Sequence, residues 1–534
     1  MYIFLLSLIT YLILFIKVLK KHLHMAQQNL YNRNKRYIKW FIKDFKKYSV
    51  YKQSIALVLI SLIVVNIFRL NNVLILAVYF SLSCIVLYKI FDLEKKQNME
   101  KLPLKVTPRI KRLVVTILII LILLTYTFFT EYRIIYLNYY YLIFILFIFL
   151  IDIIIMLAIL INTPIEKIVY YYFMFKAKSK LKEMKYLKVV GITGSYGKTS
   201  SKNILNEILS IKYNVLPSPK NFNTPNGLMI TINEHLTKFD EIFIAEMGAN
   251  KTGEIKELCD LVQPKYGILT KIGTAHLETF GSEKNILNTK FELIESLPSD
   301  GIGVLNGDDE KQLNYKLKNK CKILWIGIDN KDVDIYAKNI KVSNTGTSFD
   351  VVFKDDDKVY NFKTKLLGYA NVYNILASLA LAKEFDLTID QMLQAVSNIK
   401  QIEHRLELKP SGNITYIDDA YNSNPIGSKM ALDVLKIMPG KRYVVTPGMI
   451  ELGSKEYELN KEFGKQIKDS CDIVILVGEK QTKPIYDGLI ENNMDKDNIN
   501  IVKDIKQGLE IIRKDKDKNI FVLLENDLPD IFNE

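Results

Sequence analysis

The chain has 534 residues and a formal net charge of +14. This length exceeds what one hydrophobic core organises and predicts about three domains. Its four cysteines lie far apart without a C-x-x-C spacing, which excludes a disulfide framework and a cysteine-rich zinc site and suits a reducing compartment. The basic excess fits nucleic acid, anionic lipid or an anionic substrate, and the positions of the charges decide among these.

The first third of the chain is typical of membrane-spanning sequence. Apolar runs, each close to the roughly 20 residues that cross a bilayer, lie at 1–16 and near 53–69, 73–90, 113–130 and 134–162. The segments between the first and second runs and between the third and fourth are rich in lysine and arginine, and basic loops stay in the cytoplasm. We therefore expect a multi-pass protein of the cell membrane with five spans, its N-terminus outside and everything after residue 163 in the cytoplasm.

The basic loops have a simple explanation in this topology. They face anionic lipid head groups, so the lipid bilayer is an expected partner and nucleic acid is not.

A soluble α/β pattern follows the apolar region. Strand-like runs at 187–192, 242–246 and 266–270 alternate with helix-like runs at 197–210, 253–261 and 283–296. This alternation predicts βαβ units around a mostly parallel sheet. Residues 322–366 read as an antiparallel meander, and helices are expected near 371–385 and 389–397.

A second alternating series begins near 402 and predicts a separate α/β domain. The expected fold is therefore an α-helical transmembrane region at 1–183, an α/β domain at 184–400 in which the segment "GITGSYGKTS" predicts a P-loop ATPase, and a Rossmann-like C-terminal domain at 401–534.

The segment "GITGSYGKTS" carries the most specific chemistry. It lies between a predicted strand and a predicted helix, where backbone amides and the positive helix end bind phosphate. Gly194, Ser195, Gly197 and Ser200 would line the phosphates of ATP, Lys198 would reach the β- and γ-phosphates, and the Thr199 hydroxyl is placed for Mg²⁺. Gly191 stands one residue early for a general P-loop, and the alternative is a chance glycine-rich turn.

Two further candidates follow strand ends. Glu246 ends the run in "FDEIFIAEMGAN", where its carboxylate could hold the metal of a bound nucleotide. His276 comes just after another predicted strand, and it is either a structural histidine or a ligand.

A series of motifs resembles the Mur ligases. The segments occur in the family's order: "TGSYGKTS", "NFNTPNGL", "AEMGANKTGEI", "IGTAHLETFGS", "NTKFELIESL", "NGDD", "ANVYNILASLALA", "HRLE" and "DDAYNSNP". They cover roughly residues 187–470 and are most similar to the branch that joins D-alanyl-D-alanine to a UDP-linked muramoyl tripeptide. The resemblance implies an ADP-forming ligase that activates a carboxylate as an acyl phosphate for attack by the amine of an amino acid or dipeptide, in peptidoglycan or envelope-polymer synthesis.

The resemblance also implies residue roles. Thr199, Glu246, His276 and Lys290 match positions around two Mg²⁺ ions, with Lys290 where the family carries a lysine carbamylated by CO₂; Lys198, Lys290 and His276 are the catalytic candidates. The implied ATP-binding residues beyond the P-loop are Asn306, Asn371, Asn374, Arg405, Asp419, Tyr421, Asn422 and Asn424. The structural alternatives are a helix cap for Asn371 and Asn374, a solvated helix lysine for Lys290, and a strand-end turn for Asp418 and Asp419.

The chain departs from the family in four places. The membrane region takes the position of the domain that grips the UDP end of the substrate, so we expect a lipid-linked or polymeric acceptor. Lys271 stands where the family has asparagine. Pro447 and Gly448, and the segment "FVLLENDLPDIF", replace family residues in the domain that handles the amine.

Three other functions share features with this sequence. A poly-γ-glutamate or capsule-type ligase shares the activation chemistry. A transporter is disfavoured because the chain lacks an ABC signature and its spans carry few polar residues. A catalytically inert envelope scaffold is disfavoured by the joint presence of the P-loop and metal-site candidates.

Overall fold

The computed structural model describes residues 2–29, 31, 36–43, 60, 81, 84–85, 104–132, 143, 145–274, 277–356, 358–421, 424–450 and 452–527. The chain forms two compact units, Met1–Tyr171 and Tyr172–Glu534.

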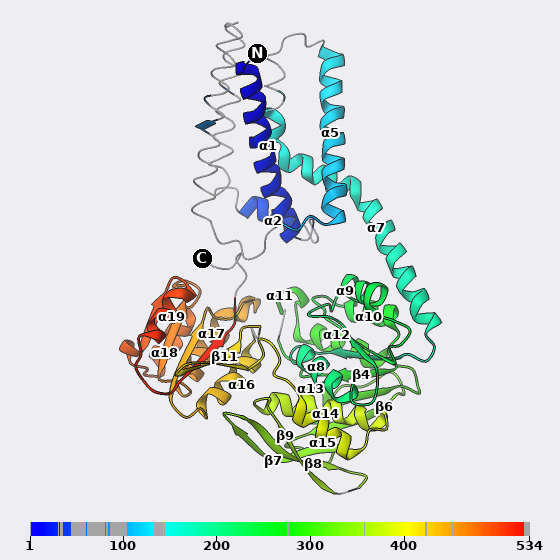
Figure 1. The fold of residues 1–534 in the computed structure, drawn as a ribbon, viewed down its shortest axis with the longest axis vertical. Helices are drawn as coiled ribbons and strands as arrows, with labels where there is room; N and C mark the ends of the chain where they lie inside the picture. The colour runs from blue at the N-terminus through cyan, green and yellow to red at the C-terminus, as the bar shows by residue number, and fades with distance from the viewer. Residues whose placement is uncertain are drawn as a thin grey trace. The chain divides into compact units, whose positions relative to one another are not determined.

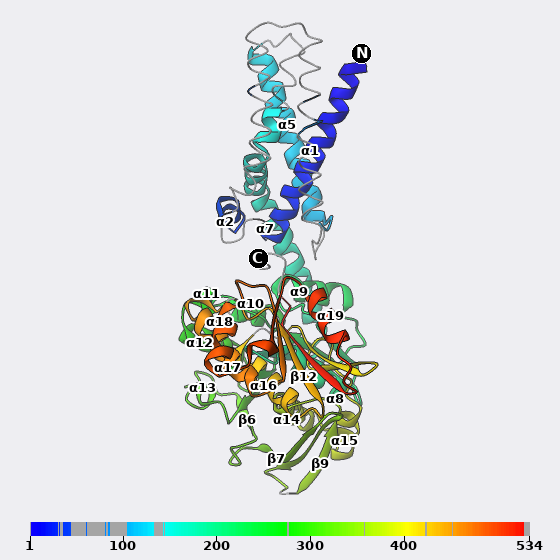
Figure 2. The ribbon, with the colours of Figure 1, turned by 90° about the vertical axis from the view of Figure 1, so that its left-hand side faces the viewer.

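The first unit is built from long helices (Figures 1 and 2). Its helices are α1 (Tyr2–Gln28), α2 (Arg36–Lys43), α5 (Pro108–Tyr132) and α7 (Ile151–Glu183), the last of which continues into the second unit. Leu14, Ile117 and Ile155 are buried in its apolar core. The Arg112 guanidinium donates to both carboxylate oxygens of Glu166 at 2.8 and 2.9 Å, which ties α5 to α7.

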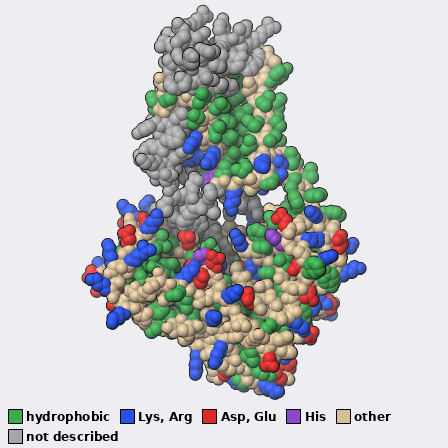
Figure 3. Space-filling view, viewed as in Figure 1, with side chains coloured by type: hydrophobic (Ala, Val, Ile, Leu, Met, Phe, Trp, Pro, Cys, Tyr) green, Lys and Arg blue, Asp and Glu red, His purple; other side chains and the backbone are tan. Residues whose placement is uncertain are grey.

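The described residues bear only in part on the predicted spans. Pro108–Phe128 and Ile151–Glu183 are long and apolar enough to cross a membrane, by length and composition alone. The first expected span lies within α1, whereas those near 53–69 and 73–90 fall almost wholly outside the described residues. Apolar side chains cover much of the visible surface of α5 (Figure 3). Ile122 and Leu123 on this helix are 66% and 58% exposed. The count of five spans stays a prediction.

A nine-stranded sheet, in the order β2-β3-β1-β4-β5-β6-β7-β8-β9, organises the first part of the second unit. Its strands are β1 (Lys188–Thr193), β2 (Val215–Pro217), β3 (Ile242–Glu246), β4 (Tyr266–Leu269), β5 (Ile302–Asn306), β6 (Lys322–Gly327), β7 (Ile335–Ser343), β8 (Gly346–Phe353) and β9 (Val359–Thr364). The strands from β2 to β7 pair in parallel. Their carboxyl ends therefore meet at one edge, where ligands bind in open α/β sheets.

Helices cover both faces of this sheet. They are α8 (Lys198–Leu209), α9 (Pro225–Ile230), the π-helical turn Thr231–His235, α10 (Glu254–Val262), α11 (Leu277–Phe280), α12 (Glu283–Glu295), α13 (Glu310–Leu313), α14 (Tyr369–Glu384) and α15 (Ile389–Asn398). α8 packs on α14, and α10 packs on α12. This arrangement confirms the expected alternation of strands and helices.

The predicted meander at 322–366 is wrong in its first strand. β6 pairs in parallel with β5 and with β7, and only β7, β8 and β9 are antiparallel. The connection from β5 to β6 contains α13, and a helical crossover returns the chain parallel to the strand it left. β9 lies beside α15 in both ribbon views.

A six-stranded sheet, in the order β10-β11-β15-β12-β13-β14, forms the C-terminal part. Its strands are β10 (Glu407–Ser411), β11 (Ile414–Asp419), β12 (Lys441–Thr446), β13 (Ile473–Val477), β14 (Ile499–Val502) and β15 (Ile520–Glu525); its helices are α16 (Pro425–Lys436), α17 (Glu456–Lys468), α18 (Lys483–Glu491) and α19 (Ile505–Arg513), with short 3₁₀ turns at Gly453–Lys455 and Lys496–Asn498. Every pair is parallel except β10 with β11. The α/β domain expected from residue 402 on is therefore present, and its antiparallel edge strand β10 was not expected.

Candidate active site

The phosphate loop joins β1 to α8. Gly194 and Gly197 have φ values of +152° and +81°, and a Cβ on Gly194 would lie 1.9 Å from Thr270 Oγ1, so this turn requires glycine. Lys198 Nζ donates to the carbonyls of Gly194 and Ser195 at 2.9 and 3.1 Å. The ammonium therefore folds back over the loop that would hold the phosphates.

The surroundings of Lys198 lower the pKa of its amine. Burial lowers the pKa of Lys198 to about 8, the carboxylate of Glu246 acts against this shift, and the charge of Arg405 adds to it. Arg405 and Glu246 thus both lie within electrostatic range of the phosphate loop.

The loop after β4 is bound directly to the phosphate loop. The backbone amide of Ser195 donates to the Lys271 carbonyl at 3.0 Å, and the Thr274 amide donates to Tyr196 Oη at 3.0 Å. A Cβ on Gly273 would lie 2.2 Å from the Tyr196 ring, so the two loops are in close contact. The Lys271 ammonium lies 3.6 Å from Asp309. His276, which follows this loop, lies outside the described residues.

Glu246 is the centre of a buried polar cluster. Its Oε1 accepts hydrogen bonds from the Thr199 hydroxyl and the Asn223 amide, both at 3.1 Å. Its Oε2 lies 3.1 Å from the Lys202 ammonium. The predicted pair of Thr199 and Glu246 is therefore brought together, whereas sequence reasoning gave no role to Asn223 or Lys202. The signal for Lys202 was its position one helical turn after Lys198.

The oxygen atoms of this cluster fit a magnesium ion. Mg²⁺ prefers carboxylate and hydroxyl oxygen ligands and is usually bound through one or two carboxylates plus substrate phosphates. Thr199 Oγ1 and Glu246 Oε1 provide such a pair beside the phosphate loop.

Lys290 lies on α12 and is buried, with 3% of its surface exposed. Its Nζ lies 5.7 Å from the centre of the Phe280 ring. Burial, with the positive charge of Lys198 as the next cause, lowers the pKa of Lys290 well below its usual range. A solvated helix lysine is therefore the wrong interpretation of this residue.

The predicted asparagines are buried and hydrogen-bonded within the protein. Asn374 Oδ1 accepts from the Ser201 hydroxyl at 2.8 Å and lies 3.1 Å from the position of a Cβ on Gly197, so it supports the phosphate loop. Asn371 Nδ2 donates to the Leu367 carbonyl at 2.9 Å. Neither side chain caps α14, whose N-cap residue is Gly368 without a side-chain cap.

Asn306 lies at the end of β5. Its Oδ1 accepts from the amide of Asp308 at 2.9 Å, and Asp308 in turn accepts from the Tyr373 hydroxyl of α14 at 2.8 Å. This chain of contacts holds the start of α14 against the carboxyl edge of the sheet.

The C-terminal domain supplies the remaining candidates. The Arg405 guanidinium donates to the Tyr421 carbonyl, and the Tyr421 side chain is exposed. Asn424 Oδ1 accepts from the Gly427 amide at 2.7 Å and so caps α16. Asn422 lies outside the described residues.

Asp419 is buried and pairs with a second carboxyl group that sequence reasoning missed. Asp419 and Glu525 are register partners at the ends of β11 and β15. Ser428 Oγ donates to Glu525 Oε1 at 2.6 Å, and the Leu406 amide donates to Asp419 Oδ1 at 3.2 Å. Burial, and next the negative charge of Asp419, raise the pKa of Glu525 well above its usual range. The carboxyl group of Glu525 therefore keeps its proton at a higher pH than an exposed glutamate does.

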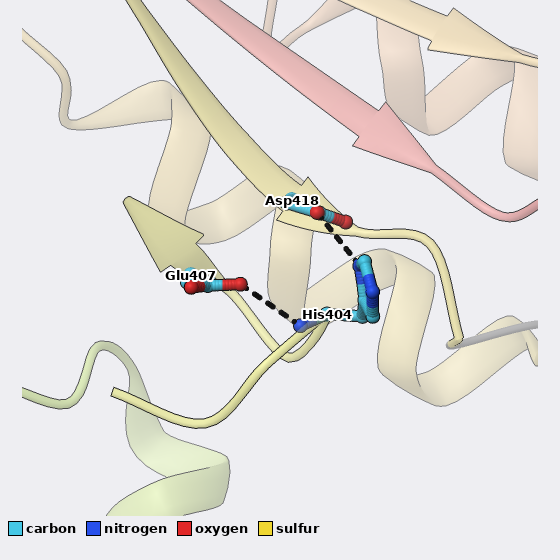
Figure 4. A group of neighbouring side chains, drawn as sticks. All are labelled: His404, Glu407 and Asp418. Atoms are coloured by element: carbon cyan, nitrogen blue, oxygen red, sulfur yellow. Dashed lines mark hydrogen bonds and ion pairs between the residues drawn. The ribbon is translucent and has the colours of Figure 1, made fainter. Parts of the chain in front are cut away.

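Asp418 belongs to a different cluster, with His404 and Glu407 (Figure 4). His404 Nδ1 lies 2.8 Å from Asp418 Oδ2, and the His404 amide donates to Glu407 at 3.1 Å. These three groups have metal-ligand geometry, but the Lys409 ammonium lies 2.6 Å from Asp418 and 2.9 Å from Glu407. An internal cation already neutralises the carboxylates, so we describe this cluster as an ion-pair network at the start of the C-terminal domain.

These features define a two-domain α/β protein built to bind a nucleoside triphosphate at the carboxyl edge of its central sheet. The sequence signatures of the Mur ligase middle domain and of the Mur ligase glutamate ligase domain match residues 192–382 and 404–524. The chain belongs to the Mur ligase family, and it is an ATP-dependent, ADP-forming peptide ligase of that family.

Named relatives agree with this assignment. The chain is 30% identical over 353 residues to the UDP-N-acetylmuramoyl-tripeptide–D-alanyl-D-alanine ligase of Bacillus subtilis, which covers 65% of this chain and 75% of the relative. It is 32% identical to the Escherichia coli ligase of the same name, over 55% of this chain and 65% of that relative. The crystal structure of the MurF ligase from Thermotoga maritima in complex with ADP is similar with a TM-score of 0.60 at 26% identity, over 67% of this chain and 80% of the other.

Proposed function

We propose that this chain is a membrane-anchored ligase that activates a carboxylate as an acyl phosphate and joins it to an amine during synthesis of peptidoglycan or another envelope polymer. The observation that carries the proposal is the convergence of Lys198, Thr199 and Glu246 at the carboxyl edge of the sheet, with buried Lys290 in the same electrostatic environment. The named relatives support a muramoyl peptide as the acid and a dipeptide as the amine.

The proposed chemistry has two steps. A carboxylate oxygen of the acceptor attacks the γ-phosphorus of ATP, and ADP leaves. The amine nitrogen then attacks the acyl carbon, inorganic phosphate leaves, and the nitrogen gives up a proton. Lys198 moves from its carbonyl partners to the transferring phosphoryl group and offsets its negative charge.

The metal site would be held by Thr199 and Glu246, with His276 and Lys290 as the family positions for a second ion. Mg²⁺ bound there would supply neutralising charge to the phosphates. Asn223 and Lys202 orient Glu246 from the protein side.

Carbamylation of Lys290 is part of the proposal. A lysine amine reacts with CO₂ in its unprotonated form, and the burial of Lys290 favours that form. The product is a carbamate, so a carboxylate would take the place of the buried amine. Labelled bicarbonate should enter a stable adduct in the wild-type protein and not in Lys290→Gln.

The membrane region would present the acceptor. The match to the Mur ligase domains begins at residue 192, and the helices before it include two of sufficient length and apolarity to cross a bilayer. We propose that these helices act in place of a domain that binds UDP, with the catalytic domains in the cytoplasm, and that the acceptor is lipid-linked or polymeric.

Reconstitution tests this proposal. Purified protein in vesicles should release ADP with a lipid-linked muramoyl peptide and D-alanyl-D-alanine, faster than with the soluble UDP-linked tripeptide. Equal rates would contradict the role of the membrane region. Lys198→Ala should abolish product formation, and cellular function that survives this substitution would instead indicate a scaffold.

A further inference from the structure

Lys202 and Glu246 form an ion pair inside the protein beside the proposed metal site. The side chains are 2% and 1% exposed, and the ammonium lies 3.1 Å from Glu246 Oε2. Lys202 Nζ also donates to the Lys220 carbonyl. Two opposite charges buried this deeply depend on one another, because removing either leaves the other without compensation.

The two oxygens of Glu246 have different surroundings. Oε1 accepts two hydrogen bonds, from Thr199 and Asn223. Oε2 accepts no hydrogen bond from the residues that the structure describes, although the Lys202 ammonium is close to it. Lys202 therefore neutralises the charge of Glu246 Oε2 without a well-directed hydrogen bond. A divalent cation at the same oxygen would neutralise this charge in the same way.

From these contacts we infer that Lys202 is an internal counter-ion of Glu246. It neutralises the Glu246 carboxylate until a metal ion binds there together with the nucleotide. A carboxylate that already faces an ammonium attracts a free divalent ion weakly, since the ion must share the carboxylate with a positive charge. Nucleotide phosphates add the negative charge and the extra ligands that a second cation needs. Lys202 thus makes metal binding depend on nucleotide, which goes beyond the proposed ligase reaction but rests on its metal site.

The experiment titrates full-length protein with Mn²⁺ in the absence of nucleotide and follows both Mn²⁺ binding and the melting temperature. Wild-type protein should bind Mn²⁺ weakly, with a melting temperature that does not respond. Lys202→Ala should bind Mn²⁺ at least about tenfold more tightly, because the competing positive charge beside Glu246 is gone, and its melting temperature should rise as Mn²⁺ is added. Lys212→Ala is the matched control, because Lys212 donates to backbone carbonyls of Phe385 and Asp386, and it should behave as wild type.

The double variant Lys202→Ala/Glu246→Gln separates charge from packing. It leaves the same space but no unpaired carboxylate, so it should be folded without Mn²⁺ and should lose the response. Tight Mn²⁺ binding by the wild type, or an unchanged or weaker affinity in Lys202→Ala, overturns the inference. Lys202→Ala that stays unfolded at every Mn²⁺ concentration while the double variant folds also overturns it. The titration uses no acid or amine, so its outcome is independent of whether the proposed ligase reaction is found.

Discussion

Replacing Gly273 by alanine would force apart two loops that form the phosphate site. The added Cβ would lie 2.2 Å from Cε2 and 2.7 Å from Cζ of Tyr196, so either the ring or the loop must move by about 1 Å or more to reach ordinary contact. Overpacking of this kind costs about 1–3 kcal/mol. Tyr196 immediately precedes Gly197 and Lys198, and a displacement of about 1 Å at a catalytic group can lower the rate about 100-fold.

The assay measures ADP release and the free energy of unfolding for Gly273→Ala, Tyr196→Ala and the double variant. Tyr196→Ala removes the ring that clashes, so Gly273→Ala should cost much less in that background than in the wild type. If Gly273→Ala lowers ADP release and the free energy of unfolding equally in both backgrounds, or changes neither in the wild type, the contact between Gly273 and the Tyr196 ring does not have the proposed effect.

Three further predictions follow from buried contacts. Lys198→Met should abolish ADP release while changing the melting temperature little, because the hydrogen bonds that the Lys198 ammonium makes to described residues go to carbonyls of its own loop. Ser201→Ala should lower the free energy of unfolding by about 1–3 kcal/mol, since it leaves the buried Asn374 oxygen without its donor, and Ser201→Thr, which keeps a hydroxyl, should cost less in the same denaturation experiment. For Glu525, the raised pKa means that the folded state keeps a proton that the unfolded state releases, so wild-type stability should fall as the pH rises above the usual glutamate range toward the folded pKa. Glu525→Gln should remove this fall in denaturation curves at about pH 5 and about pH 8, and parallel pH profiles of the two proteins would contradict the raised pKa of Glu525.

Local patterns were sufficient to predict most of the catalytic fold. The phosphate loop was found because its glycines, Lys198 and Thr199 stand between a strand and a helix, and the structure places them so. Glu246 was found because it ends a buried strand, and it lies within hydrogen-bond distance of Thr199.

The remaining features depend on contacts that local patterns do not encode. In the sequence Lys202 is one more polar residue of a helix, and only the position of β3 shows that it pairs with Glu246. Glu525 is likewise only the end of a strand, and its place beside Asp419 depends on β15 lying between β11 and β12. The short run that forms β6 is compatible with either strand direction, and the α13 crossover decides it. Asn374 was expected among the ATP-binding residues, and its oxygen accepts a hydrogen bond from Ser201 beside the phosphate loop, a contact that only the packing of α14 on α8 reveals.

The most direct test of the account follows the acceptor oxygen. If the carboxylate is activated as an acyl phosphate, a heavy-oxygen label on the acceptor carboxylate must appear in the inorganic phosphate released together with ADP and the amide. Wild-type protein should transfer the label to inorganic phosphate, and Lys198→Met should not. Release of AMP and pyrophosphate, or amide formed with no label in the phosphate, would contradict it.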